Sequence, residues 1–556
     1  MNKMPLNETL GHLIERISKE FPDNEALVYP DQNIRLTYKQ FNDEVDIVAK
    51  SLLALKIKKG DHVSIWSTNV PEWPILMFSI AKIGAVLVTV NTNYKTHELE
   101  YLLKQSDSKA IFLIDKFKTS EYFNWLKKVL DDAIWLGKGK LESKKFPMLK
   151  NVILFDKATS EHALSYKDFR EMGKDISDAE LDEIKKTLSE YDVVNMQYTS
   201  GTTGFPKGVM LTHHNIANNA YLIANQMKLS EKDRMCIPVP FFHCFGCVLG
   251  ILTAVTHGTT MLPIVTFNAE EVLKLVSDEK CTVLHGVPTM FIAELGLENR
   301  DKYDIKSLRT GIMAGSPCPV KIMNKVINDM HCSQITIAYG LTENSPVITM
   351  TSVDDDVEHR TTTVGRVLPP MKMRIVNLET GLDCKPGEQG EVIMAGECVM
   401  KGYYKAEKEN EAAIRKGWLH SGDLGVVDED GYLKITGRIK DMIIRGGENV
   451  YPCEIEEFLY THPKISDVQV VGVPDQKYGE QVLAAIKLKD GETATEEEIK
   501  DFCMQNIARH KQPYYVVFVN NYPMTASGKI QKFKLRNEMV KKLNLEKLEG
   551  LNNTTE

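Results

Sequence analysis

This chain has no framework of paired cysteines and no long hydrophobic run, and each absence excludes a class of protein. Its 10 cysteines are scattered over 556 residues, which argues against a disulfide-stapled secreted scaffold and predicts reduced thiols in the cytoplasm. One Cys-x-x-Cys pair, Cys244 and Cys247, has no second pair to complete a zinc or redox site, so we interpret both as packing residues. The apolar run Val248–Val255 is far shorter than the roughly 18 residues of a membrane-spanning helix.

The sequence also lacks an excess of positive charge. A net charge of −8 argues against a nucleic-acid-binding protein, because such proteins present positive charge to phosphates. The opening residues MNKMPLNETL lack the apolar core of a secretory signal, so we expect no signal peptide. With 556 residues, 43% of the whole hydrophobic and 26% charged, the chain has the composition of an ordinary globular protein with more than one core.

The common P-loop is missing, because no Gly-x4-Gly-Lys-Ser/Thr pattern occurs. In its place stands Tyr198-Thr-Ser-Gly-Thr-Thr-Gly-Phe-Pro-Lys-Gly208, rich in glycine and hydroxyl residues. The glycines let backbone amides close on an anion, while the hydroxyls and the lysine add donors and charge. The segment follows a strand predicted at Val193–Tyr198 and precedes a helix predicted to begin near His214, the expected setting of a phosphate site. We therefore predict that this loop binds a polyphosphate.

The element pattern predicts an α/β protein with two domains. Residues 1–190 alternate helical and strand patterns, which indicates βαβ units and a largely parallel sheet, and glycines beyond residue 370 punctuate short strands of a β-rich subdomain. We expect a large N-terminal domain at residues 1–439 and a small mobile α+β domain at residues 440–556. The specific segments predicted are helices at 71–82, 97–105, 175–190, 452–460 and 495–508, and strands at 86–91, 110–114, 335–338, 468–473, 482–488 and 515–520.

Several polar motifs lie outside the glycine loop. Thr342 and Glu343 follow a predicted strand in Tyr339-Gly-Leu-Thr-Glu, where a hydroxyl suits a phosphate and a carboxylate suits Mg²⁺. Asp423 stands between two glycines, as a ribose-binding carboxylate would, and Arg438 offers a planar fork to phosphate or ribose oxygens. Lys529 lies on a polar loop in Ser-Gly-Lys. Taken singly, Thr342 with Glu343 is about equally well explained as a helix cap, and Asp423 as a turn. Arg438 and Lys529, taken singly, are better explained as surface charges.

Taken together and in this order, the motifs resemble those of the adenylate-forming superfamily. That superfamily contains acyl-CoA synthetases, beetle-type luciferases and peptide-synthetase adenylation domains. The resemblance covers roughly residues 10 to 540, and it is strongest to the fatty and medium-chain acyl-CoA ligases. It implies that a carboxylate attacks the α-phosphorus of ATP, releasing pyrophosphate and leaving an acyl-adenylate. Coenzyme A then displaces AMP, so the implied cofactors and co-substrates are ATP, Mg²⁺ and coenzyme A.

The resemblance also implies roles for individual residues. The β- and γ-phosphates would be held by Thr199, Ser200, Gly201, Thr202, Thr203 and Lys207. The adenine pocket would be lined by Gly315, Ser316 and Pro317, with Tyr339 against the ring and with Asp423 and Arg438 on the ribose. Catalysis would fall to Thr342 on the α-phosphate, Glu343 on Mg²⁺, His243 near the carboxylate, and Lys529 between the two reacting anions. The C-terminal domain would turn at Lys440, bringing Lys529 for the first half-reaction and the Gly446-Gly447 loop for the second.

The residues expected around the substrate favour an apolar acid. The segment Phe241-Phe-His-Cys-Phe245 carries no carboxylate, whereas amino-acid-activating relatives usually pair a carboxylate with the substrate ammonium. A fatty acid is therefore the predicted substrate. The resemblance implies medium chain length, and the residues themselves leave the chain length open. The sequence leaves open an aryl-CoA ligase and a ligase that loads a carrier protein. It also leaves open a luciferase-like monooxygenase, a non-enzymatic nucleotide-binding descendant, and the oligomeric state.

Overall fold

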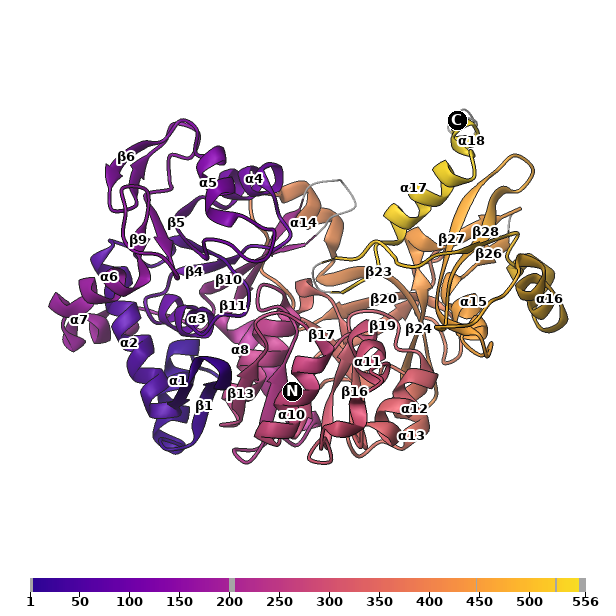
Figure 1. Ribbon diagram of the computed structural model, residues 1–556, viewed down its shortest axis with the longest axis horizontal. Helices are drawn as coiled ribbons and strands as arrows, with labels where there is room; N and C mark the ends of the chain where they lie inside the picture. Colours follow the sequence, from indigo (N-terminus) through magenta and orange to yellow (C-terminus); the bar gives the residue numbers. More distant parts are fainter. Residues whose placement is uncertain (1–3, 200–205, 447, 526–527, 550–556) are drawn as a thin grey trace.

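In the residues that the structure describes, four β-sheets form the framework of the protein. The computed structural model describes residues 4–199, 206–446, 448–525 and 528–549. Figure 1 shows a large body built by the N-terminal part of the chain and a smaller lobe, coloured orange to yellow, at the C-terminal end. The predicted α/β architecture of a large domain followed by a smaller one is confirmed.

Each sheet has its own strand order. Across the nine-stranded sheet the strands are β18 (Arg366–Val367), β17 (Val347–Met350), β16 (Gln334–Gly340), β15 (Thr310–Ala314), β14 (Val283–Leu284), β12 (Arg234–Ile237), β13 (Thr260–Pro263), β1 (Glu25–Tyr29) and β2 (Ile34–Thr37). Across the second large sheet they are β21 (Gly402–Tyr403), β11 (Lys207–Thr212), β10 (Val193–Thr199), β4 (Val86–Thr89), β3 (His62–Trp66), β5 (Ser108–Leu113), β8 (Asn151–Leu154), β7 (Lys140–Glu142) and β6 (Ile134–Gly137), with β9 (Leu164–Ser165) beside β8. A third sheet contains β19 (Lys372–Val376), β20 (Gly390–Ala395), β23 (Trp418–Val427) and β22 (Ile414–Arg415), with β24 (Leu433–Arg438) beside β23. The fourth contains β26 (Glu448–Val450), β25 (Ile443–Arg445), β28 (Gly479–Leu488) and β27 (Ile465–Asp475), with β29 (Tyr515–Phe518) beside β28.

Helices cover the faces of these sheets. In chain order they are α1 (Leu10–Glu20), α2 (Tyr38–Ala54), α3 (Glu72–Lys82), α4 (Thr96–Ser106), α5 (Tyr122–Val129), α6 (Tyr166–Glu171), α7 (Asp178–Lys185), α8 (His213–Gln226), α9 (Thr253–Thr256), α10 (Ala269–Glu279), α11 (Pro288–Leu295), α12 (Val320–Asp329), α13 (Val357–Thr362), α14 (Glu407–Ala413), α15 (Pro452–Leu459), α16 (Glu496–Asn506), α17 (Lys532–Lys542) and α18 (Glu546–Glu549). A π-helix, Phe245–Leu252, precedes α9. Local sequence explains several helix starts: Thr37 and Ser177, for example, each complete a capping box at the first turn of α2 and α7.

The largest hydrophobic core lies between the two large sheets. It joins residues such as Leu87 and Phe112 of one sheet to Ile237 and Ile312 of the other. A second core packs α4 and α5 on the outer face of the ten-stranded sheet, and a third packs α10, α11 and α12 on the outer face of the nine-stranded sheet. Strands β3, β4 and β5 pair in parallel and are almost wholly buried, as expected for a sheet covered by helices on both faces.

Most predicted elements are confirmed within a few residues, including the helix at α3, the strands β4, β5 and β16, and the α+β module at the C-terminus. The run Val248–Val255 is buried, as predicted for a core segment. No helix in the described ranges has both the length and the apolar character needed to cross a membrane. The solvated helix predicted at 175–190 is shorter, because α7 begins at the Ser177 cap and ends at Lys185.

One prediction about the phosphate loop is wrong. We expected the loop to run from a strand directly into the helix near His214, but strand β11 intervenes and pairs antiparallel with β10. The loop therefore closes a hairpin in which Thr199 lies opposite Lys207. Helix α8 begins only after β11, at the Thr212 cap. The backbone amides of that helix are consequently not next to the loop in the sequence, as they would be in a strand–loop–helix phosphate site.

The first three sheets use residues up to Arg438, and the fourth uses residues from Ile443 onward. A 3-10 turn, Ile439–Asp441, joins them and carries Lys440 on the surface. The fourth sheet has a core on each face, one with α15 and α16 and the other with α17. Because these two cores consist of C-terminal residues alone, the C-terminal part is a domain of its own. The proposed hinge at Lys440 lies in the turn Ile439–Asp441 that connects it to the rest of the chain.

Candidate functional site

The predicted site residues of the N-terminal domain gather at the carboxyl ends of β15 and β16. Gly315 follows β15, and Thr342 follows β16. Lys529 reaches this edge from the C-terminal domain: a Cβ placed on Gly315 would lie 3.1 Å from Lys529 Cε. Gly315 also has a φ of +94°, so a side chain there would be strained as well as crowded. The glycine leaves space for the lysine.

The loop that carries Lys529 is anchored across the domain boundary. The Thr289 hydroxyl on α11 donates to the Gly528 carbonyl at 3.3 Å. Burial lowers the pKa of the Lys529 ammonium from its ordinary value, and the Arg438 charge lowers it further, while the Asp423 and Glu343 carboxylates oppose the shift. An ammonium that has lost water in this way interacts more strongly with an incoming anion.

Asp423 is buried on β23 and joins two of the predicted nucleotide-binding residues. One carboxylate oxygen accepts a hydrogen bond from the Tyr339 hydroxyl at 2.9 Å, and the other is 2.7 Å from Arg438 Nε. Arg438 lies directly opposite Asp423 in the β23–β24 pair, so the hairpin itself sets this contact. Burial and the neighbouring carboxylate raise the pKa of Tyr339 well above its usual range, which keeps its hydroxyl a donor. A carboxylate has lone pairs left over for a sugar diol.

A second group connects Thr342 and His243 through a thiol. The Cys244 sulfur is 3.6 Å from Thr342 Oγ1 and 3.6 Å from His243 Nδ1. The Phe245 amide donates to His243 Nδ1 at 3.1 Å, so this nitrogen is an acceptor and Nε2 carries the proton. Burial lowers the pKa of His243 to about 3, and the Lys529 charge contributes to the shift. The imidazole is therefore neutral at physiological pH and acts as a polar donor without a charge.

A third group surrounds Glu343. The Tyr403 hydroxyl donates to Glu343 Oε1 at 2.8 Å, and Lys207 Nζ lies 5.0 Å from the centre of the Tyr403 ring. The described residues hold no cluster of three or more acidic, histidine or cysteine side chains that would bind a metal by themselves. Glu343 fits Mg²⁺ in another way, because Mg²⁺ commonly takes one or two carboxylates and completes its shell with phosphates and water.

The structure thus brings together most of the predicted site residues that it describes. The gathered residues are Lys207, His243, Gly315, Tyr339, Thr342, Glu343, Asp423, Arg438 and Lys529. Thr199 stands across the hairpin from Lys207, and Ser316 and Pro317 continue the exposed loop after Gly315. Gly446 lies elsewhere, packed on Tyr478 within the C-terminal domain. Ser200, Gly201, Thr202, Thr203 and Gly447 lie outside the described residues.

Two side chains in these groups are missing from the sequence-based assignment. The sequence pattern indicates only a packing role for Cys244, although it adjoins His243 in the sequence. Tyr403 is 60 positions from Glu343, and nothing in its local sequence points to the site. Only the pairing of β21 with β11 places its ring near Lys207.

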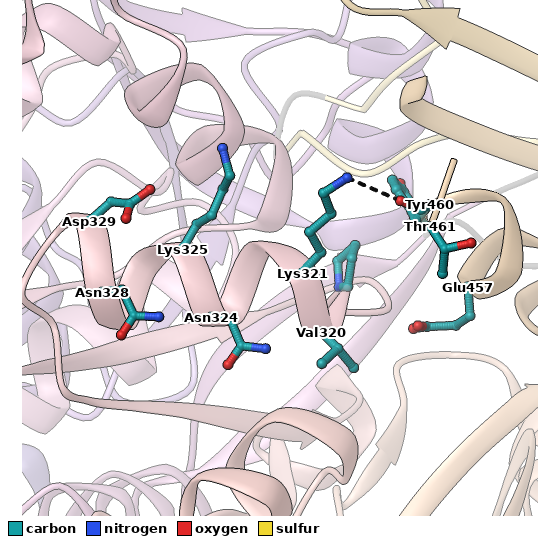
Figure 2. A pocket seen from close by; sticks show the side chains of 10 residues that line it. Val320, Lys321, Asn324, Lys325, Asn328, Asp329, Glu457, Tyr460 and Thr461 are labelled. Atoms are coloured by element: carbon teal, nitrogen blue, oxygen red, sulfur yellow. Dashed lines mark hydrogen bonds between the residues drawn. The ribbon is translucent and has the colours of Figure 1, made fainter. Parts of the chain in front are cut away.

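A separate groove of about 510 Å³ lies between α12 and α15. It is lined by polar side chains such as Lys321, Asn324 and Glu457, and Lys321 Nζ donates to the Tyr460 carbonyl at 3.3 Å (Figure 2). The groove contains none of the gathered site residues. We therefore do not assign the acid to it.

Comparison with known proteins agrees with the order of the motifs. The sequence model of the AMP-binding enzymes matches residues 14–404, and that of the AMP-binding enzyme C-terminal domain matches residues 454–529. The chain is 53% identical over 541 residues to a Bacillus subtilis (strain 168) protein named acyl-CoA synthetase YngI, covering 97% of this chain and 98% of that protein. It is 42% identical over 547 residues to the mitochondrial medium-chain acyl-CoA ligase ACSF2 of Bos taurus, covering 97% and 89%. Among solved structures, an anthranilate CoA ligase, AuaEII, in complex with anthranoyl-AMP superimposes with a TM-score of 0.83 at 27% identity, covering 96% and 98%.

Proposed function

We propose, from the premise that this chain belongs to the AMP-binding enzyme family and is an AMP-forming acyl-CoA synthetase, that its acid substrate is a medium-chain fatty acid. Ligases of this kind form acyl-CoA from an acid, ATP and coenzyme A. The observation that carries the adenylation step is the position of Lys529 beside Gly315, within the same site as His243 and Thr342, and the chain length is supported by the name of the ACSF2 relative. That arrangement supports a role for Lys529 as the cation between the carboxylate and the phosphate.

Charge stabilisation explains why that lysine is needed. Two anions that approach within a few ångströms in a dry site repel strongly, and a cation between them lowers the barrier to attack on the α-phosphorus. Thr342 would donate to an α-phosphate oxygen. Asp423 and Arg438 would hold the ribose, and Lys207 would hold the departing phosphates. Mg²⁺ at Glu343 would neutralise phosphate charge when bound.

An apolar acid is supported by the neutrality of the Phe241–Phe245 segment and of His285, whose ring packs on Phe245. His285 accepts from the Ile312 amide and donates to the Leu249 carbonyl, so both of its nitrogens are occupied by backbone. Burial lowers the pKa of His285 to about 4, which leaves it uncharged at physiological pH. Phe245 packs on its ring with centroids 5.9 Å apart. A pocket formed here would offer no charge to pair with a substrate ammonium, and the ACSF2 relative is named for medium-chain acids.

The second half-reaction needs the active site to open for the thiol of coenzyme A. We assign the turning point to Lys440 and the second catalytic surface to the Gly446-Gly447 loop. The separate cores of the C-terminal sheet support a movement of that domain as a unit. All ten cysteines are unpaired, which supports our placement of the enzyme in the reducing cytoplasm.

Release of AMP from ATP with a panel of straight-chain and aromatic acids, each with and without coenzyme A, tests the proposal. We expect a maximum at medium chain length that depends on coenzyme A. A maximum at long or very short chains would contradict the chain-length assignment. Adenylation without a response to coenzyme A would indicate a carrier protein as the acceptor.

An aryl-CoA ligase is the second candidate. It is favoured by the likeness to AuaEII, which was solved with an aryl adenylate, and by the aromatic side chains Phe241, Phe242 and Phe245. A preference for benzoate-type acids over alkanoates of equal size in the same panel would select it.

A further inference from the structure

Tyr403 makes two contacts with predicted site residues through two parts of one side chain. Its hydroxyl donates to Glu343 Oε1 at 2.8 Å, and the Lys207 ammonium lies over its ring at 5.0 Å from the centroid. Glu343 follows β16 of one large sheet, whereas Lys207 begins β11 of the other. Tyr403 therefore contacts a predicted site residue on each of these two elements.

The backbone of Tyr403 is itself fixed. Its amide donates to Asn410 Oδ1 at 2.6 Å, and its carbonyl accepts from Asn410 Nδ2 at 3.1 Å. Strand β21 pairs with β11, with Tyr403 opposite Val209. Tyr403 as a whole residue is 8% exposed. A side chain held in this way is suited to orienting its neighbours, because little entropy remains for it to lose.

The two contacts hold opposite charges without cancelling them. In the described part of the chain, Lys207 has no carboxylate partner within ion-pair distance, and Glu343 Oε2 has no hydrogen-bond partner. An aromatic face attracts a cation, and a phenol donates to a carboxylate, yet neither neutralises the charge it holds. A direct pair between Lys207 and Glu343 would remove both charges from use.

We propose that Tyr403 is a positioning residue for the metal–nucleotide complex: its hydroxyl fixes the Glu343 carboxylate for the metal, and its ring fixes Lys207 for the phosphates. The inference rests on the proposed function, in which Glu343 binds Mg²⁺ and Lys207 binds ATP. It predicts that the hydroxyl of Tyr403 affects the affinity for the metal and that the ring affects the affinity for the nucleotide.

Tyr403→Phe and Tyr403→Leu separate the two parts. We would measure binding of α,β-methylene ATP in EDTA by calorimetry, and binding of Mn²⁺ to the enzyme–analogue complex by electron paramagnetic resonance. Tyr403→Phe keeps the ring, so nucleotide affinity in EDTA should stay within about two-fold while Mn²⁺ binding weakens about ten-fold. Tyr403→Leu should in addition weaken nucleotide binding in EDTA by about three-fold.

Tyr404 provides a matched control. Its hydroxyl donates to Asp107 Oδ2 at 2.8 Å, and Lys405 lies over its ring at 5.2 Å, so it makes the same two kinds of contact with residues that we do not place in the site. Tyr404→Phe and Tyr404→Leu should change neither affinity. Equal losses for the Tyr403 and Tyr404 variants would overturn the proposal, as would a Tyr403→Phe enzyme with unchanged Mn²⁺ binding.

Glu343→Gln distinguishes failure of the inference from failure of its premise. If this variant binds Mn²⁺ as tightly as the original protein, Glu343 is not the metal ligand, and both the metal assignment and the role of Tyr403 are wrong. If Glu343→Gln weakens Mn²⁺ binding and Tyr403→Phe does not, the metal assignment stands and only the role of Tyr403 is wrong.

Discussion

The two domains supply the site in different ways. The N-terminal domain contributes side chains that are already held by one another, such as Asp423 with Tyr339 and Arg438, and Glu343 with Tyr403. The C-terminal domain contributes Lys529 from a loop whose described hydrogen bond to the other domain is the one from Thr289 to Gly528. The nucleotide side of the proposed site is therefore built within one domain, whereas Lys529, the proposed cation for the first reaction, belongs to the other. A site divided in this way allows one half-reaction to be lost without the other.

Lys529→Ala is the strongest test of that division. The variant should lose about a thousand-fold or more in adenylate formation, because the only cation delivered by the C-terminal loop would be gone. Conversion of a supplied acyl-adenylate to the thioester should remain within a few-fold of normal. Pyrophosphate exchange and single-turnover thioester formation measure the two halves. Lys534→Ala, which removes an exposed lysine from α17 of the same domain, should affect neither, and equal loss of both halves in Lys529→Ala would contradict the assignment.

Asp423→Asn tests the nucleotide-binding residues that the N-terminal domain holds in place. The substitution keeps the shape but removes the charge that faces Arg438, and an amide has a single oxygen to offer to a ribose diol. We expect the KM for ATP to rise about ten- to a hundred-fold in adenylation, with a smaller change in kcat.

A matched triad elsewhere in the N-terminal domain controls for general damage. Asp355 accepts from the Tyr432 hydroxyl at 2.7 Å and pairs with Arg366 at 3.3 Å. Asp355→Asn should leave the KM for ATP unchanged. A similar rise in both variants would show that loss of the buried pair, and not loss of a ribose contact, is responsible.

Lys440→Pro tests the proposed hinge between the two domains. Proline fixes its own φ and restricts the residue before it, so the turn Ile439–Asp441 should change conformation less readily. We expect overall turnover to fall about ten-fold, while ATP binding and adenylate formation stay close to normal. Lys440→Ala removes the same side chain but leaves the backbone free, and it should retain turnover. Full activity of the proline variant would place the hinge elsewhere.

Sequence patterns predicted the contacts set by short motifs better than those set by sheet pairing. The alternation of apolar residues in 71–82 and 110–114 was enough to predict α3 and β5, because burial and local period agree there. The same reasoning missed β11. We interpreted Lys207–Thr212, which follows the glycine loop, as the connection that leads into α8. The resemblance assigned Asp423 and Arg438 to the same ligand, the ribose. Their direct pairing with each other follows from the β23–β24 register, which the structure provides. Tyr403 and Cys244 act across 60 and 98 positions, and no local pattern encodes a contact of that range.

The smallest expected effect concerns Cys244. Among the described residues, its sulfur is the hydrogen-bond partner of the Thr342 hydroxyl. Burial raises the pKa of the Cys244 thiol, so the thiol stays protonated at physiological pH. Because His243 Nδ1 already accepts from the Phe245 amide, the single thiol proton is available to Thr342 Oγ1. The Thr342 proton is then free for a phosphate oxygen.

Cys244→Ala should therefore slow adenylation about three- to ten-fold, and Cys244→Ser should restore most of the rate because a hydroxyl donates in the same direction. Cys247 is the control: it is equally buried but accepts from Gln197 at 3.0 Å, so Cys247→Ala should leave pyrophosphate exchange close to normal. If the serine variant is as slow as the alanine variant, the sulfur acts through its volume alone. Thr342 would then be oriented by the backbone of its 3-10 turn, and the N-terminal half of the site would owe its geometry to main-chain structure more than to side-chain hydrogen bonds.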